Sequence, residues 1–358
     1  MLQNWTEECT NYRKLRDEIQ GGLATMSAEN IPTKAYCNCL ALKCGLDPIG
    51  HAGNFQDALI VEVPLPWKSD MFYDEKVLPS EIRNLLALWL QQYRETGVYP
   101  HRPLTIAPDK EYTLDGYRRV MLYTRPAAPF TAFEKVEYLV PVEKLGILVW
   151  SLFEDRAALP QFDSYRVPDA DHVRDILVCT HGTIDVACAK FGYPLYKHLR
   201  DTYSSEHLRV WRVSHFGGHV FAPTLMDMPI GHYWAYVGKE QAVQIIQREG
   251  NVAALRGHYR GWAGLDDGFQ QTAECDLWQR YGWDWFGYPR MGETLVQDED
   301  NIDSQWADVC LRWKLPDESE MAEKLRVDVA HMVETPSSTD GESTYPYSQY
   351  RVRQTRGL

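Results

Sequence analysis

The sequence predicts an α/β fold of the α+β type, built from two similar halves and followed by an irregular, aromatic-rich C-terminal extension. Three observations lead to this prediction. The 358 residues exceed the size of one ordinary domain and fit two related halves. Apolar, β-branched runs alternate with stretches whose apolar residues recur at helical spacing. The same order of runs returns after a polar, proline-containing segment at residues 156–172.

Composition and charge narrow the class of protein. With 44% hydrophobic and 24% charged residues, the chain has the composition of an ordinary soluble globular protein. No apolar run reaches the length of about 18 residues needed to span a bilayer, and the N-terminus lacks the apolar segment of a secretory signal, so we expect a cytoplasmic location. The formal charge of -13 argues against nucleic-acid binding, which requires neutralisation of phosphates. A basic protein partner or a small redox partner, of unknown identity, is easier to reconcile with this charge.

The first half is expected to span residues 37–158, after a helical N-terminal lead-in over residues 1–36 with a helix at residues 7–19. Its first element is an apolar run closed by prolines, which is typical of a strand buried on both faces. The expected elements are that strand at residues 57–67, a helix between Pro79 and Gly97, strands at residues 104–107, 119–124 and 131–139, and a helix at residues 143–155.

The second half is expected to span residues 170–250 and to repeat this order. The expected elements are a strand at residues 173–179, a helix at 186–201, strands at 208–214 and 232–237, and a helix at 239–249. A βαβ unit followed by a ββα unit is the order of a thioredoxin-like fold. The pattern therefore predicts two thioredoxin-like halves.

The remaining chain is divided by composition. Residues 251–333 form the aromatic-rich extension, whose tryptophans and tyrosines between residues 259 and 288 could stack on sugars or bases but more often pack an extended segment onto a domain. Asp266, Asp267, Glu274 and Asp276 could supply a pair of carboxylates for glycoside hydrolysis. Residues 334–358 are poor in aliphatic side chains, so we expect this tail to be disordered or draped on the surface.

Eight cysteines in a chain of this length do not indicate a disulfide scaffold, so clustered cysteines favour metal binding or redox chemistry. Cys37, Cys39 and Cys44 lack the paired spacing of common zinc modules, and we interpret them as buried or capping thiols, with a second metal site as the less favoured alternative. The isolated cysteines are expected to pack as small apolar side chains. These are Cys9, Cys275 and Cys310.

Two cysteines and two histidines in the second half form the most informative group of residues. Cys179 ends an expected strand and Cys188 opens an expected helix, which places both at the carboxyl edge of the sheet, where α/β proteins usually have their sites. His215 and His219 flank a Gly-Gly pair that disfavours a helix and predicts a tight loop. Such a set suits tetrahedral zinc or a [2Fe-2S] cluster. Spacing does not decide between them, although the wide Cys spacing mildly favours iron, and a metal-free thiol pair is a further alternative.

Four segments resemble the sucrase/ferredoxin-like family, whose members are thioredoxin-like [2Fe-2S] ferredoxins. They are DPIGHAGNFQDALIVEVPLPW, CTHGTIDVACAKFGYPLY, SHFGGHVFAPT and HYRGWAG. The resemblance extends over about residues 35–290, and its most specific element is the HxGGH loop combined with the upstream cysteine pair. It implies that Cys179, Cys188, His215 and His219 hold a [2Fe-2S] cluster.

The resemblance implies a one-electron carrier or redox component rather than a stand-alone enzyme, although an enzymatic role is left open. Two thiolates leave an oxidised cluster neutral, whereas four would leave it negative, so its reduction potential should be elevated and, with imidazole ligands, should depend on pH. Residues that could support the ligands are Thr180, His181, Thr183, Asp185 and Ser214. The alternatives are a zinc- or thiol-based thioredoxin-like redox protein, and a protein that binds or hydrolyses carbohydrate.

Overall fold

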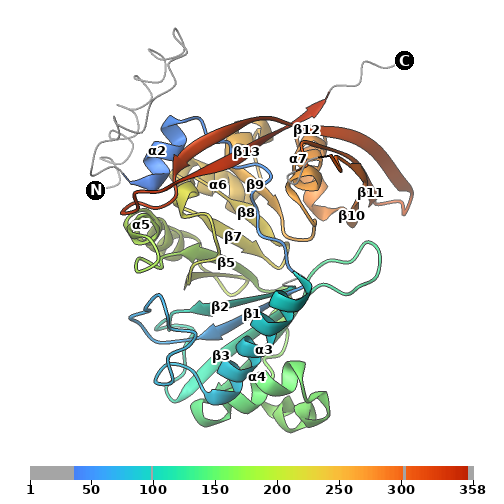
Figure 1. The fold of residues 1–358 in the computed structure, drawn as a ribbon. Helices are drawn as coiled ribbons and strands as arrows, with labels where there is room; N and C mark the ends of the chain where they lie inside the picture. The colour runs from blue at the N-terminus through green and yellow to red at the C-terminus, as the bar shows by residue number, and fades with distance from the viewer. Residues whose placement is uncertain (1–35, 98–99, 301–303, 354–358) are drawn as a thin grey trace.

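The computed structural model describes residues 36–97, 100–300 and 304–353 (Figure 1). The helix expected at residues 7–19 lies outside the described residues. The first half has strands and helices in the order that the sequence predicts. They are β1 (Asp57–Glu62), α3 (Ser80–Thr96), β2 (His101–Ile106), β3 (Tyr117–Thr124), β4 (Glu134–Pro141) and α4 (Leu145–Phe153).

The second half repeats this order and this strand pairing. In each half the first two strands are parallel, and the third and fourth follow as antiparallel neighbours. Its elements are β5 (Arg174–Cys179), α5 (Val186–Tyr203), β6 (Leu208–Val213), β7 (Leu225–Met228), β8 (His232–Trp234) and α6 (Lys239–Gln247). The sequence did not predict β7, because the run is short and contains Asp227, which is buried through an ion pair with Arg174 at 2.6 Å. With β7 in place, both halves have the predicted βαβ and ββα units, and the predicted fold class is confirmed.

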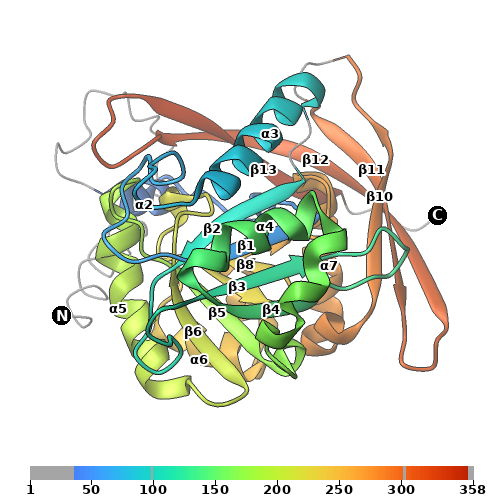
Figure 2. The same cartoon turned by 90° about the horizontal axis from the view of Figure 1, so that it is seen from below.

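One mixed nine-stranded sheet runs through both halves in the order β4-β3-β1-β2-β6-β5-β7-β8-β9. The halves meet at β2 and β6, which are joined at the pair Ile106 and Val213. The Tyr123 hydroxyl on β3 donates a 2.6 Å hydrogen bond to Asp175 on β5, although three strands lie between β3 and β5 in the sheet order. The sheet therefore folds back at the β2–β6 junction, and the two halves face each other as two layers (Figures 1 and 2).

Alternation along the strands supplies apolar side chains to both faces of each layer. On β1, for example, Ile60 points into the core between the layers, and Leu59 points to the outer face. Helices α3 and α4 cover the outer face of the first layer, and α5 and α6 cover that of the second. Burial on both faces explains why these strands appear in the sequence as continuous apolar runs.

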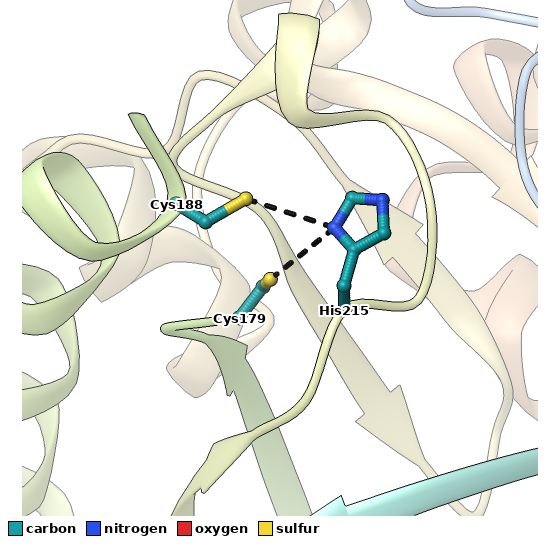
Figure 3. Close-up of side chains that lie close together, drawn as sticks. All are labelled: Cys179, Cys188 and His215. Carbon is teal, nitrogen blue, oxygen red and sulfur yellow. Dashed lines mark hydrogen bonds between the residues drawn. The ribbon is translucent and has the colours of Figure 1, made fainter. Parts of the chain in front are cut away.

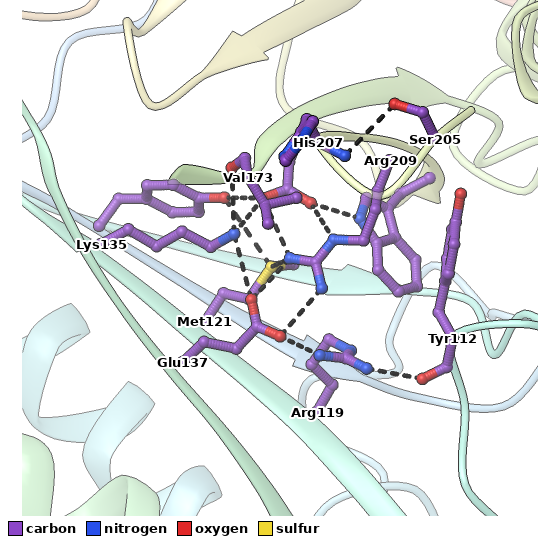
Figure 4. Close-up of polar contacts among 12 residues, drawn as sticks. Tyr112, Arg119, Met121, Lys135, Glu137, Val173, Ser205, His207 and Arg209 are labelled. Atoms are coloured by element: carbon purple, nitrogen blue, oxygen red, sulfur yellow. Dashed lines mark hydrogen bonds and ion pairs between the residues drawn. The ribbon is translucent and has the colours of Figure 1, made fainter. Parts of the chain in front are cut away.

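A buried polar cluster lies between the layers (Figure 4). The Arg209 guanidinium from β6 donates to the Glu137 carboxylate on β4 at 2.6 Å and to the Asp175 carboxylate on β5 at 3.0 Å. Lys135 contacts both carboxylates, and Arg119 pairs with Glu137. Because each ion has partners of opposite charge, the cluster links strands of the two layers without leaving an isolated buried charge.

The C-terminal part differs from the expected irregular extension. It contains β9 (Tyr259–Trp262), which joins the large sheet, α7 (Gly268–Tyr281), and a separate antiparallel sheet of β10 (Arg290–Gln297), β11 (Trp306–Lys314), β12 (Glu320–Pro336) and β13 (Thr344–Arg353). Of the two states expected for the tail, disorder is wrong for residues 344–353, which pair with β12 along most of their length. Residues 354–358 lie outside the described chain.

The aromatic side chains of this part are mainly core residues. Trp262, Trp278 and Trp285 are buried and pack in the core beneath the outer face of the second layer. The buried Glu274 carboxylate accepts hydrogen bonds from the Tyr259 hydroxyl at 2.8 Å and the Trp285 indole at 2.7 Å. These rings and this carboxylate therefore do not form an open sugar platform, and the expectation that the segment packs onto the domain is confirmed.

Short elements complete the fold. Helix α2 (Cys37–Lys43) packs against the second half and the C-terminal sheet. The 3-10 helices are η2 (Val142–Lys144), η3 (Arg156–Tyr165), η4 (Ala170–His172), η5 (His219–Phe221), η6 (Val252–His258) and η7 (Gly282–Gly287). Within the described ranges, no helix has both the length and the apolar character needed to cross a bilayer.

Candidate metal centre

The strand-to-helix connection of the second half holds both predicted cysteines. Cys179 is the last residue of β5, and Cys188 lies in the first turn of α5, which begins at Val186 as predicted. Asp185 caps this helix, because its carboxylate accepts a 2.8 Å hydrogen bond from the Ala187 N–H. Gly192 lets α5 pack closely against the end of β5, since a Cβ at this position would lie 1.9 Å from the Cys179 carbonyl oxygen. The two thiols are consequently buried side by side at the carboxyl edge of the sheet.

The loop between the two histidines has the glycine geometry that the sequence predicts. Gly217 and Gly218 have φ angles of 97° and 78°, in the left-handed region that favours glycine. A Cβ on Gly218 would also lie 2.6 Å from the Arg260 guanidinium, which donates a 3.1 Å hydrogen bond to the Gly217 carbonyl. Arg260 donates to the His51 carbonyl as well. Segments that are distant in the sequence therefore converge on this loop and fix its path.

Three of the four predicted ligands come together. The His215 Nδ1 lies 3.8 Å from the Cys179 Sγ and 3.7 Å from the Cys188 Sγ (Figure 3). All three ligand atoms lie within 4.8 Å of one another, and both cysteines are buried. A protein-derived set of two thiols and one imidazole at this separation can hold a metal ion or a cluster.

The electrostatics of the thiol pair favour one thiolate. The hydrogen bond from Cys188 lowers the pKa of the Cys179 thiol well below its ordinary value, and His215 acts in the same direction. The same pairing, together with burial, raises the pKa of Cys188 well above its ordinary value. Cys179 therefore loses its proton more readily than Cys188, and metal binding would favour the thiolate form of both.

The fourth predicted ligand lies beside this group rather than in it. The His219 ring centroid is 5.6 Å from that of His215, and the His219 Nδ1 faces Cys37 at 3.4 Å and Asp185 at 3.5 Å. Cys37, Asp185 and His219 form a second group of possible ligands within 4.8 Å of one another. Sequence reasoning did not connect Cys37 with this site, because no local pattern relates residues so far apart in the chain.

Residues proposed to support the ligands have varied contacts. The His181 Nδ1 accepts a 3.3 Å hydrogen bond from the His215 N–H, which orients the first residue of the loop. Thr183 donates to the Trp67 carbonyl, and Ser214 accepts from the Thr105 N–H, so both attach the site to the first half. Beside them lies a pocket of about 200 Å³. It is lined by Leu65, Pro66, Trp67, Thr180, His181, Gly182 and Arg212.

The three cysteines near the N-terminus do not act as one cluster. Cys37 is buried, Cys39 is half-buried and Cys44 is exposed. Among the described residues, only Cys37 of the three belongs to a group of possible metal ligands. Cys275 and Cys310 are buried in the core, in agreement with the packing role expected for them.

Comparison with known proteins gives one positive result. A search of the curated proteins and a search of the solved structures each found no match. A family model described as sucrase/ferredoxin-like matches residues 48–261, which is more than half of the chain and includes Cys179, Cys188, His215 and His219. The matched region contains the strands and helices of both halves from β1 to α6, and the loop on which the histidines lie. The chain belongs to the sucrase/ferredoxin-like family.

Proposed function

We propose that the protein is a [2Fe-2S] iron-sulfur protein that carries single electrons, with Cys179, Cys188, His215 and His219 as the cluster ligands. The observation that supports it most directly is the convergence of two buried thiols and one imidazole at the carboxyl end of β5. His219 lies on the same loop, next to His215. Membership of the sucrase/ferredoxin-like family supports the same ligand set, because the family resemblance implies it.

The residues of the site fit such a group. Thiolates and imidazoles are the donors that histidine-ligated [2Fe-2S] centres use, and the Gly-Gly turn lets the backbone come close to the site. When bound, the cluster would accept and release one electron. Cys179 and Cys188 would bind as thiolates, and burial would keep water from the sulfur atoms.

A further part of the proposal concerns the reduction potential. With two neutral imidazoles in place of two thiolates, the cluster would carry less negative charge, so its potential should lie well above that of a four-cysteine ferredoxin. The ligand imidazoles should also make the potential depend on pH. Protein-film voltammetry across the neutral and alkaline range measures both properties, and a flat, low potential would contradict this part.

The first experiment is purification under anaerobic conditions with assays of iron and sulfide. About two irons and two sulfides per chain and a red-brown colour are expected. H215C and H219C should each retain a cluster of lower potential, whereas C179A and C188A should lose it. C275A, which removes a buried thiol elsewhere, is the matched control. Colourless wild-type protein without iron after such purification would overturn the proposal.

A zinc- or thiol-based redox protein is the second candidate. The paired thiols favour it, because a thiolate beside a protonated thiol is the arrangement that thiol redox chemistry uses. In that case the purified protein would contain zinc or no metal. Titration against dithiothreitol would then show a reversible disulfide between Cys179 and Cys188.

A further inference from the structure

His219 is held by side chains from other parts of the chain. Its Nδ1 lies 3.4 Å from the Sγ of Cys37, the first residue of α2, and 3.5 Å from the Oδ2 of Asp185, the cap of α5. The Cys37 thiol in turn donates to the same Asp185 oxygen at 3.6 Å. The three side chains form a closed triangle of polar contacts on the side of His219 that carries Nδ1.

The turn between β12 and β13 completes this arrangement. The Thr339 N–H donates to Asp185 Oδ2 at 2.8 Å, and the Thr339 hydroxyl donates to Oδ1 at 2.7 Å. Together with the Ala187 N–H and the Cys37 thiol, the Asp185 carboxylate accepts four hydrogen bonds. These donors hold the carboxylate in one orientation, with its Oδ2 3.5 Å from the His219 Nδ1. The group is therefore suited to orienting His219.

The contacts also select a tautomer of His219. An ionised carboxylate only accepts hydrogen bonds, and the Cys37 sulfur, whose hydrogen points to Asp185, can accept one as well. Both neighbours of the His219 Nδ1 are then acceptors, so Nδ1 carries the hydrogen and Nε2 keeps its lone pair. His215 is arranged differently, because its Nδ1 faces the two candidate ligand thiols (Figure 3).

We infer that Asp185, with Cys37 and Thr339, positions His219 so that it offers Nε2 to the cluster, while His215 offers Nδ1. The inference rests on the proposed function. Cys37 and Thr339 both lie outside residues 48–261, the part that matches the family. Apolar contacts of α2 and β12 with η5 accompany the hydrogen bonds, since Ala41, Phe221 and Val333 pack in one buried cluster. The N- and C-terminal parts of the described chain thus complete the cluster site.

Isotope labelling tests the nitrogen assignment directly. The protein is produced with histidine labelled with ¹⁵N at Nδ1 only, reduced with dithionite, and studied by electron-nuclear double resonance. One strongly coupled ¹⁵N, from His215, and one strongly coupled ¹⁴N, from His219, are expected. H219C should remove the ¹⁴N coupling and keep the ¹⁵N coupling. Two strongly coupled ¹⁵N nuclei in the wild-type protein would overturn the assignment.

The positioning role is tested with D185N. Asparagine caps a helix about as well as aspartate, so α5 should persist, but the amide presents a donor toward His219 or Cys37. Loss of such a supporting contact typically costs about 10- to 100-fold in metal affinity, so D185N should lose iron to a chelator at least about tenfold faster and show altered nitrogen couplings. C37A and T339V should shift the same couplings with the fold intact by circular dichroism.

D267N is the matched control, since Asp267 caps α7 by accepting a 2.8 Å hydrogen bond from the Gln270 N–H. It should leave iron release and the nitrogen couplings unchanged. If wild-type protein binds no iron, the proposed function fails and this inference falls with it. If wild-type protein carries the cluster and D185N, C37A and T339V all match it in couplings and iron release, only the positioning role is refuted.

Discussion

At the scale of single residues, Arg260 is a buried cation beside the candidate cluster. It donates hydrogen bonds to the carbonyls of Gly217 and His51 and lies over the rings of Phe221 and Tyr233. No carboxylate of the described residues pairs with it. Burial, with a smaller effect of Arg102, lowers the pKa of Arg260 to about 10, so it remains charged at neutral pH. Its positive charge should favour the reduced cluster.

R260M is therefore expected to lower the reduction potential. A charge within about 10 Å contributes on the order of 1–2 kcal/mol at the effective dielectric of such sites, or roughly tenfold in the reduction equilibrium. R260K keeps the charge and should retain most of the potential, although it cannot donate in the same forked geometry. Redox titration with mediator dyes measures this, with R280M, a change at an exposed arginine, as the control. Equal potentials in all four proteins would exclude an electrostatic role for Arg260.

At the scale of elements, the Gly-Gly turn offers a matched pair of substitutions. Both glycines have a left-handed φ, but a Cβ at Gly217 meets no atom within 4 Å, whereas one at Gly218 would meet Arg260 and Phe221 within 3 Å. G217A should therefore cost about 1 kcal/mol of unfolding free energy through backbone strain alone. G218A adds the steric conflict and should cost more and weaken cluster retention. Urea unfolding and iron content measure the difference between the two variants. Equal losses of stability and of iron would contradict the close approach of Gly218 to Arg260 and Phe221.

The same elements show what local sequence can predict. The run that forms β5 and the start of α5 at Val186 depend on nearby residues, so the positions of Cys179 and Cys188 were predictable. The turn at the histidines was predictable from its glycines. The strand β7 was not, because burial of Asp227 depends on Arg174 of another strand.

Contacts between distant segments could not be predicted from local patterns either, because they also depend on residues far away in the sequence. Cys37 and Thr339 reach Asp185 only because α2 and the β12–β13 turn pack on the second half. The strands of the C-terminal sheet are half-exposed and gain stability from pairing with one another, so their composition resembled that of an irregular segment. The contacts of Asp185 and the C-terminal sheet therefore depend on strand register and on the packing of distant segments, which local residue types do not determine.

At the scale of the whole molecule, the polar cluster between the layers should contribute to the free energy of unfolding by linking the two halves. Asp175 is completely buried and accepts hydrogen bonds from Tyr123, Trp211 and Arg209 as well as Lys135. Although burial opposes ionisation, Arg209 and Lys135 lower the pKa of Asp175 to about 2. The folded carboxyl therefore binds its proton less readily than an unfolded one, whose pKa is about 3.9.

This difference gives a stability effect with a defined sign. The contribution of Asp175 is complete above about pH 4 and is lost as the pH falls toward about 2, because protonation favours the unfolded chain in that window. D175N leaves Glu137 as the only carboxylate of the cluster for Lys135, Arg209 and Arg119, so it should cost about 3–5 kcal/mol of unfolding free energy at pH 7. The exposed pair of Lys197 and Asp201 provides the control, since D201N should cost less than about 0.5 kcal/mol. Urea unfolding at several pH values measures the pH dependence of the Asp175 contribution and the cost of each substitution. If D175N costs no more than D201N, the packing of the two layers depends on apolar burial alone.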